Sequence, residues 1–350
     1  MSMRILYGVQ GTGNGHITRA RVMARALDRA GVQVDYLFSG RPPERYFNME
    51  PFGDYQTRRG LTLVTAAGRV QLARTLGYNN LLRLWRDINT LDLDGYDLVI
   101  TDFEPISAWA ARRQRVPSVG IAHQYAFCYP VPGTERAPWL KPALQLIAPV
   151  QQAVGVHWDP FDGPILPPLI EPPRYPLSCD RERILVYLPF ENCTDVARIL
   201  AQFPGWRFIL YAGVEQGRRE GNLEIKPFSR EGFQLDLAAC GGVIANAGFG
   251  LCSEAIQAGK KLLVKPLAQQ IEQAANARAL ELLGHARVMQ ALDTGQIADW
   301  LQLENPPAQC WPDTAGALVD WLLAGRQESI DRLACRLWQE MPARAGVAKR

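Results

Sequence analysis

The sequence predicts an α/β protein with two parallel-sheet domains that face a central cleft, followed by C-terminal helices. Three observations support this prediction. The chain has 350 residues, which is enough for two domains of ordinary size. Short apolar runs alternate with helical patterns in both halves of the chain, as is typical of parallel sheets. A proline-rich segment separates the two series of alternating elements.

The first half of the chain contains five predicted strands. They cover residues 4–9, 32–38, 98–101, 118–122 and 153–156. Because helical patterns join these runs, we expect a Rossmann-like domain over residues 1–158. Residues 159–178 follow with seven prolines, a residue that is excluded from central strands and helix interiors. This segment is the predicted hinge, and its polyproline tendency favours a semi-rigid connection.

The second half of the chain repeats the alternation. Its predicted strands cover residues 184–188, 208–211, 223–226, 243–245, 261–265 and 287–289. They indicate a second Rossmann-like domain over residues 179–325. Apolar positions at helical spacing over residues 314–341, interrupted at Gly325, predict two final helices. Residues 326–350 are the predicted terminal helix and tail.

Composition excludes several classes of protein. The seven cysteines are scattered and show no metal-ligand spacing, so we expect reduced thiols, no metal site and no cofactor. The first residues lead directly into a strand pattern, and no apolar run reaches the length of a membrane span. A cytoplasmic protein is therefore expected. The net charge of +3 is far below that of a nucleic-acid binder, so no nucleic-acid partner is expected.

A glycine-rich loop follows the first predicted strand and precedes a helical pattern. Glycines let a ligand approach the backbone closely, and the helix N-terminus presents unpaired N–H groups to an anion. The spacing differs from that of dinucleotide-binding and ATP-binding loops. A histidine at the end of the loop is a candidate general base, although a tight turn capped by that histidine is an equal alternative. The loop residues are Gly11, Thr12, Gly13, Asn14, Gly15 and His16.

Three further polar side chains follow predicted strands of the first domain. Asp102 and Glu104 come after the strand at 98–101, and His123 comes after the strand at 118–122. The carboxyl edge of a parallel sheet is where such folds bind ligands. We therefore take Glu104 as a second candidate base and His123 as an acceptor-side candidate. Helix capping is the alternative, with nearly equal weight for Asp102 and less for Glu104.

The clearest motif lies between residues 243 and 276. Gly248 and Gly250 follow a strand and open a helix, which makes a cradle of backbone amides for a diphosphate. Glu254, about one turn further on, suits the two hydroxyls of a ribose. Glu272 and Gln273 follow the next strand and suit the hydroxyls of a sugar. Taken singly, each of these residues could be an ordinary polar residue on a helix, and only their joint order indicates a nucleotide-sugar site.

These motifs resemble GT-B glycosyltransferases, most closely glycosyltransferase family 28, which includes peptidoglycan N-acetylglucosaminyltransferase and monogalactosyldiacylglycerol synthase. The resemblance spans nearly the whole chain, but only the two glycine-rich blocks are diagnostic. It implies that the loop at residues 11–16 lies near acceptor and diphosphate, with His16 as base, and that the second domain binds the donor. The donor-binding residues that it implies are Phe228, Asn246, Gly248, Phe249, Gly250, Leu251, Glu254, Glu272 and Gln273.

Two departures from the family pattern bear on the donor. A paired Gln-Gln in the family is Glu272-Gln273 here, and the Gly/Ser-rich loop after the first strand of the second domain is Pro-Phe-Glu-Asn-Cys at residues 189–193. Glu191 in that loop would repel a phosphate that Asn192 could otherwise help to hold. The identity of the donor sugar therefore stays open.

The expected activity is an inverting, metal-independent transfer of a hexose or N-acetylhexosamine from a uridine-diphosphate sugar to an acceptor hydroxyl. The nucleotide sugar is a substrate, and the acceptor is unidentified, with lipid-linked and glycan-linked alcohols as the classes considered. A nucleotide-sugar epimerase of the same fold and a non-catalytic nucleotide-sugar-binding protein are the alternatives. Residues 69–86 interleave arginine with leucine and tryptophan, so this segment either contacts anionic lipid at the inner membrane face or packs on its own domain.

Overall fold

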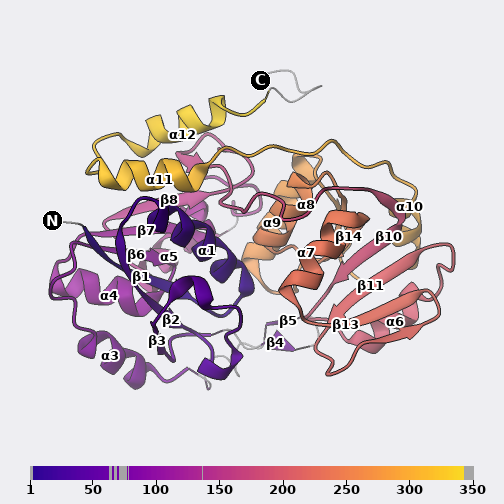
Figure 1. Ribbon diagram of the computed structural model, residues 1–350, viewed down its shortest axis with the longest axis horizontal. Helices are drawn as coiled ribbons and strands as arrows, with labels where there is room; N and C mark the ends of the chain where they lie inside the picture. Colours follow the sequence, from indigo (N-terminus) through magenta and orange to yellow (C-terminus); the bar gives the residue numbers. More distant parts are fainter. Residues whose placement is uncertain are drawn as a thin grey trace.

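The computed structural model describes residues 3–62, 65–66, 69–70, 77, 79–135 and 137–342. Two α/β domains lie side by side, each with helices on both faces of a central sheet (Figure 1). The predicted fold class is confirmed. The predicted segment 69–86 and the C-terminal tail fall partly outside the described residues.

The first sheet has seven strands in the order β3-β2-β1-β6-β7-β8-β9, and every neighbouring pair is parallel. All five strands predicted for this domain are present. Two edge strands were not predicted, namely β3, whose residues are mostly polar, and β9, which lies inside the proline-rich segment. Proline is tolerated there because β9 is at the sheet edge. The strands are β1 (Arg4–Gln10), β2 (Gln33–Ser39), β3 (Tyr55–Arg58), β6 (Leu98–Asp102), β7 (Ser118–Ala122), β8 (Gln152–Val156) and β9 (Ile165–Leu166).

Four α-helices and three short 3-10 helices accompany this sheet in the described residues. A separate two-stranded hairpin, β4 (Thr65–Ala66) with β5 (Arg69–Val70), precedes α3. The helices are α1 (Asn14–Arg29), α3 (Leu81–Thr90), α4 (Pro105–Gln114), α5 (Leu140–Ile147), η1 (Pro43–Arg45), η2 (Glu50–Phe52) and η3 (His123–Cys128).

The second sheet also has seven strands, in the order β12-β13-β11-β10-β14-β15-β16. Only the short edge strand β12 is antiparallel, and it was not predicted; the six predicted strands are present. The strands are β10 (Asp180–Tyr187), β11 (Arg207–Ala212), β12 (Arg218–Glu220), β13 (Leu223–Pro227), β14 (Cys240–Ala245), β15 (Lys261–Val264) and β16 (Arg287–Val288). The helices are α6 (Cys193–Leu200), α7 (Arg230–Ala239), α8 (Phe249–Gln257), α9 (Ile271–Leu282) and α10 (Thr294–Leu301).

The two predicted final helices are α11 (Thr314–Leu323) and α12 (Ile330–Gln339). Although α11 lies within the range predicted for the second domain, the chain crosses back after α10 and both helices lie against the first domain (Figure 1). The indole N–H of Trp338 donates to the backbone oxygen of Ile165 in β9 at 2.7 Å. One buried apolar cluster accordingly includes residues of both sheets and of these helices.

The strand order of each sheet reverses once, between β1 and β6 in the first sheet and between β10 and β14 in the second. Ligands of open α/β folds bind outside the carboxyl ends of the strands at this reversal point. The glycine loop before α1 and the loop after β6 share the first reversal point, and the loops after β10 and β14 share the second. The topology therefore explains why the predicted motifs of each domain gather in one place.

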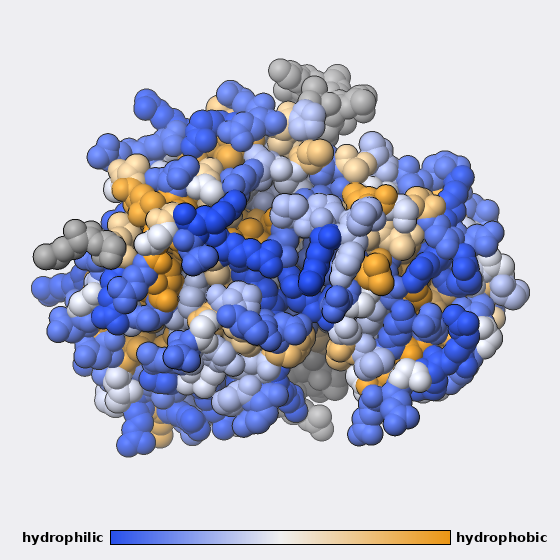
Figure 2. Space-filling model, in the orientation of Figure 1, coloured by the Kyte–Doolittle hydropathy of each residue, from blue (hydrophilic) through white to orange (hydrophobic). Residues whose placement is uncertain are grey.

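Polar side chains cover most of the face of the molecule in Figure 2 and continue across the junction of the two domains. Hydrophobic residues form scattered patches on this face. Within the described residues, no helix is both long enough and apolar enough to cross a membrane.

Candidate active site

The histidine of the first glycine loop is paired with an aspartate. His16 lies in the first turn of α1, and its Nδ1 is 2.7 Å from Oδ1 of Asp102 at the end of β6. Arg19, one turn further along α1, donates to both oxygens of Asp102. In the tautomer with the N–H on Nδ1, donating to the carboxylate, Nε2 carries the lone pair that can accept a proton. The His16 side chain is 13% exposed, whereas that of Asp102 is fully buried.

Asp102 is held in the ionised form. Burial on its own would raise the pKa of this carboxyl, but the Arg19 guanidinium and the His16 ring together hold the pKa below its usual value. The next residue, Phe103, has φ 55°, a left-handed conformation that is rare for a bulky side chain and typical of functional turns. Asp102 and Glu104 lie on either side of this turn and contact different residues.

Glu104 has a different place from the one expected for a catalytic base. It caps α4: its oxygens accept from the backbone N–H of Ile106 at 2.9 Å and of Ser107 at 2.6 Å, and from the hydroxyl of Ser39 at 2.6 Å. The side chain is completely buried, and burial raises its pKa despite these hydrogen bonds. Its hydrogen bonds are those of helix capping, the alternative considered for this residue.

The two predicted glycine loops meet at the junction of the domains. A Cβ placed on Gly250 would lie 3.6 Å from the Cα of Gly15. Gly250 is in the first turn of α8, and Gly15 is in the first turn of α1, so the N-termini of two helices lie side by side. Both ends present unpaired backbone N–H groups and the positive end of a helix dipole. This place is suited to a diphosphate.

An arginine that sequence reasoning did not single out lies next to this place. Arg41 donates to the backbone oxygen of Gly11 and to Oδ1 of Asn14 at 3.2 Å. Burial lowers the pKa of its guanidinium. Among the described residues, no carboxylate forms an ion pair with Arg41. Its local sequence, Gly-Arg-Pro-Pro, gives no signal of this role.

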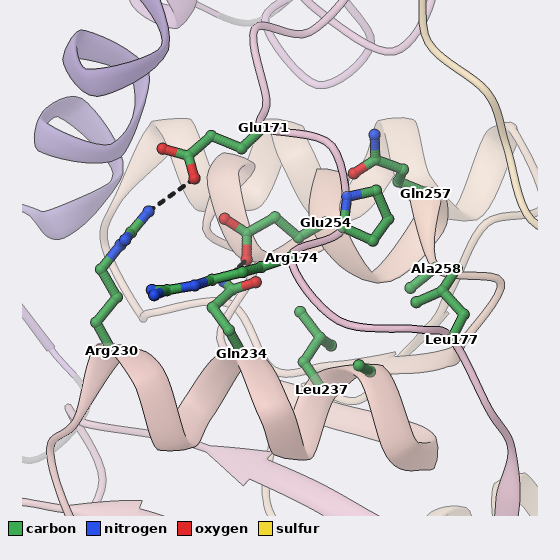
Figure 3. A pocket seen from close by; sticks show the side chains of 11 residues that line it. Glu171, Arg174, Leu177, Arg230, Gln234, Leu237, Glu254, Gln257 and Ala258 are labelled. Atoms are coloured by element: carbon green, nitrogen blue, oxygen red, sulfur yellow. Dashed lines mark hydrogen bonds and ion pairs between the residues drawn. The ribbon is translucent and has the colours of Figure 1, made fainter. Parts of the chain in front are cut away.

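Glu254 lies in a small pocket of about 20 Å³ between α7 and α8, which the segment 171–177 borders (Figure 3). Its Oε2 accepts from the side-chain N–H of Gln234 at 2.9 Å. At the mouth of the pocket Arg230 donates to Glu171 at 2.8 Å, and Glu171 also pairs with Arg25 of the first domain. Burial raises the pKa of Glu254 to about 7. The pocket combines a carboxylate, an amide and a guanidinium, which are groups that bind hydroxyls and phosphates.

The other predicted donor-binding residues differ in their exposure and in their hydrogen bonds. Phe228 is exposed at the end of β13 and lies 6.0 Å, ring to ring, from Tyr187 of β10. Asn246 is buried; its amide donates to the backbone oxygen of Lys265, and its Oδ1 has no hydrogen-bond partner. Gln273 is buried, and its oxygen accepts from the backbone N–H of Leu267 at 2.8 Å. The oxygen of Gln273 is therefore already engaged in holding the loop before α9.

His123 and Phe249 are packed between the domains instead of facing a ligand. Their rings stack at 3.9 Å. Nδ1 of His123 is 2.9 Å from the backbone oxygen of Val156, and its Nε2 is 2.8 Å from Oδ1 of Asn276 on α9. Burial lowers the pKa of His123. The prediction of acceptor contact for His123 is therefore not supported, because both ring nitrogens already have partners.

The expected repulsion by Glu191 is neutralised. Its carboxylate accepts from Nζ of Lys265 at 2.7 Å, and both side chains are largely buried. Asn192 caps α6, with its oxygen accepting from the backbone N–H of Thr194 at 2.9 Å. The sequence gives no signal of this ion pair, since Lys265 lies 74 residues away from Glu191.

A further contact joins the first domain to the donor block directly. The side-chain N–H of Gln124 donates to Oε2 of Glu272 at 3.0 Å and lies 3.4 Å from Nε2 of His16. Gln124 was not predicted as a site residue. No group of three or more His, Cys, Asp or Glu side chains in the described ranges could hold a metal ion.

Comparison with known families agrees with this arrangement. The chain matches the model of glycosyl transferase family 1 over residues 3–132 and 163–304. Two Rossmann-like domains with facing glycine loops define the class of GT-B glycosyltransferases. The protein belongs to glycosyl transferase family 1 and is an enzyme of that family. No curated protein matches the chain in sequence.

Several solved structures have the same fold. UGT89C1 from Arabidopsis thaliana, solved with UDP-L-rhamnose, has a TM-score of 0.60 and 14% identity over 96% of this chain and 98% of that one. SnogD from Streptomyces nogalater has a TM-score of 0.53 and 17% identity over 91% and 99%. MurG from Acinetobacter baumannii has a TM-score of 0.51 and 14% identity over 97% and 95%.

Proposed function

We propose that this protein transfers a hexose or N-acetylhexosamine from a UDP-sugar to an acceptor hydroxyl, with inversion at the anomeric carbon. One observation carries the proposal: the His16–Asp102 pair lies directly beside the two helix N-termini that meet at Gly15 and Gly250. The proposed base and the proposed diphosphate site are therefore adjacent. The fold neighbour solved with UDP-L-rhamnose supports uridine as the base of the donor.

In the proposed reaction the acceptor hydroxyl gives its proton to Nε2 of His16 while its oxygen bonds to the anomeric carbon. The bond from that carbon to the diphosphate oxygen breaks, and its electron pair leaves with UDP. Asp102 stabilises the imidazolium that forms. The amides and dipoles of α1 and α8 stabilise the developing charge on the diphosphate, which is the contribution that a metal ion makes elsewhere. A single displacement inverts the anomeric configuration.

The donor is proposed to bind to residues of the predicted block between 243 and 276, together with Phe228. Glu254 in its pocket binds the ribose hydroxyls, the first turn of α8 from Gly248 to Leu251 binds the diphosphate, and Glu272 binds the sugar. Phe228 is proposed to border the base, which its exposure at the edge of β13 supports. The resemblance to family 28 stays a prediction, and the particular sugar stays open.

We also propose that helix α3 contacts an anionic membrane surface, where the acceptor would lie. Leu81, Leu82 and Trp85 on α3 are 68%, 82% and 65% exposed, and Arg83 and Arg86 beside them are exposed as well. Apolar side chains flanked by arginines are typical of helices that lie at a lipid interface. This surface supports a lipid-linked acceptor alcohol.

Turnover by variants of His16 tests the proposed reaction. UDP release from UDP-sugars is measured with water and with a panel of glycan-linked and lipid-linked alcohols. His16→Ala is expected to lower turnover about 100-fold or more while nucleotide binding persists, because it removes the base and leaves the donor site intact. His285→Ala, beyond the far end of α9, is the control and should retain activity. Full activity of His16→Ala would contradict the proposal.

Product analysis separates the proposed reaction from its alternatives. Proton NMR of the anomeric centre should show inversion relative to the donor. Conversion of a UDP-sugar into its epimer without any acceptor would indicate the epimerase alternative, and binding without turnover would indicate a sensor.

A further inference from the structure

Gln124 contacts residues of both domains in the candidate site. It lies in η3, directly after β7, and is only 8% exposed. One of its neighbours is the base His16 on α1, and the other is Glu272 in the first turn of α9. The partners lie 108 and 148 residues away in the sequence and belong to different domains.

The chemistry of its partners fixes the orientation of the Gln124 amide. A carboxylate oxygen of Glu272 accepts from Gln124, so the NH₂ group of Gln124 faces Glu272. In the tautomer of His16 that carries its proton on Nδ1, the nitrogen facing Asp102, Nε2 is an acceptor, and it lies 3.4 Å from this NH₂ group. Both N–H bonds of the amide are thereby used.

The carbonyl oxygen of Gln124 has no partner among the residues that the structure describes. Its Oε1 is buried and accepts no hydrogen bond from any of them. A buried amide oxygen without a donor costs free energy, and such an atom at the edge of a site is a place for a hydroxyl of a ligand.

In the proposed reaction the transferred sugar lies beside Gln124. The diphosphate site lies where Gly15 meets Gly250, and His16 directly follows Gly15. In an in-line displacement the anomeric carbon lies between the diphosphate and the base. Since Gln124 is in contact with the base, a sugar placed in this way presents its hydroxyls to Gln124 and Glu272.

We propose that Gln124 is a donor-sugar-binding residue supplied by the first domain, with its Oε1 accepting a hydrogen bond from a sugar hydroxyl that Glu272 also contacts. The proposal rests on the proposed function and deepens it. A UDP-sugar then engages both domains, whereas UDP, which lacks the sugar, leaves Oε1 unpaired. Gln124 therefore distinguishes the sugar donor from the product nucleotide.

The test compares the affinity of UDP with that of a UDP-sugar by isothermal titration calorimetry. The sugar nucleotide is the one that stabilises the wild type most in a panel of UDP-glucose, UDP-galactose, UDP-N-acetylglucosamine and UDP-rhamnose. Gln124→Leu removes the amide at similar volume. Gln114→Leu is the matched control, because Gln114 on α4 of the same domain also makes two hydrogen bonds, to the backbone of Leu91 and Leu93, away from the cleft.

Gln124→Leu is expected to bind UDP within twofold of the wild type and to bind the UDP-sugar about tenfold more weakly, the effect of losing one hydrogen bond. Gln114→Leu is expected to melt at a lower temperature and to keep the wild-type ratio of the two affinities. An unchanged affinity of Gln124→Leu for the UDP-sugar would overturn the proposal, as would an equal loss for UDP and UDP-sugar. A wild type that binds no uridine nucleotide would instead contradict the proposed function itself.

Discussion

At the scale of single residues, the local motifs were predictable and their partners were not. The glycine loop with His16 and the block around Glu254 are contiguous in the sequence, so their chemistry can be read there. Asp102 and Gln124 act on His16 from 86 and 108 residues away, and only the strand order of the first sheet brings them together. Glu104 caps α4 in the structure, a role that the sequence does not distinguish from that of a base, because both follow a buried strand.

The raised pKa of Glu254 predicts that donor binding depends on pH. Below a pKa of about 7 the carboxyl is protonated and accepts hydrogen bonds from the ribose hydroxyls less well. The affinity for a UDP-sugar is therefore expected to rise as the pH increases from 5.5 to about 7 and to level off above that. Isothermal titration calorimetry across this pH range measures the affinity. A UDP-sugar is used instead of UDP because the terminal phosphate of a UDP-sugar is esterified and does not lose a proton in this range.

Glu254→Gln is the control for this pH dependence. It keeps the shape of the side chain and cannot ionise, so its affinity should be weak and nearly constant over the same range. A pH dependence in Glu254→Gln as steep as that of the wild type would assign the titration to another group.

At the scale of elements, strands rich in β-branched residues were predicted correctly and short polar strands were not. β3 and β12 read Tyr-Gln-Thr-Arg and Arg-Arg-Glu, sequences without apolar alternation, and both are at sheet edges. Their pairing comes from the neighbouring strand and not from their own propensity. β9 is a further edge strand, of two residues, within a proline-rich segment that indicates a linker.

The exposed apolar face of α3 predicts binding to anionic lipid. Sedimentation with phosphatidylglycerol vesicles at low salt should carry the wild type into the pellet, and binding should weaken as salt rises because Arg83 and Arg86 contribute electrostatically. Replacing Leu82 and Trp85 by serine should abolish sedimentation. Since both side chains are exposed, the melting temperature should hardly change.

Neutral phosphatidylcholine vesicles provide the control for charge. Equal sedimentation with neutral and anionic vesicles would assign binding to the apolar residues alone. No sedimentation with either would remove the proposed membrane contact.

At the scale of the whole molecule, buried polar contacts fix the relation of the two domains. Asn276 is fully buried, and its amide joins His123 of the first domain to the backbone oxygen of Ala247 in the second. Asn276→Ala leaves both partners unsatisfied and is expected to cost about 1–3 kcal/mol of stability. It should also let the domains separate, which small-angle scattering would detect as a larger radius of gyration.

Asn222→Ala is the matched control for domain separation. The Asn222 amide donates to three backbone oxygens, all within the second domain. This variant should lose stability as well but keep the wild-type radius of gyration. The same radius for both variants and the wild type would show that Asn276 does not hold the domains together.

The central claim is that the pocket at Glu254 and the first turn of α8 bind a nucleotide sugar. A thermal-shift panel of UDP-, GDP-, dTDP- and CMP-sugars with the wild type and Glu254→Ala tests it most directly. A ligand at 100 times its dissociation constant stabilises the native state by about 2.7 kcal/mol, so a UDP-sugar should raise the melting temperature of the wild type by several degrees. Glu254→Ala should show no such shift. If no nucleotide sugar stabilises the wild type, or if Glu254→Ala is stabilised equally, the account is contradicted.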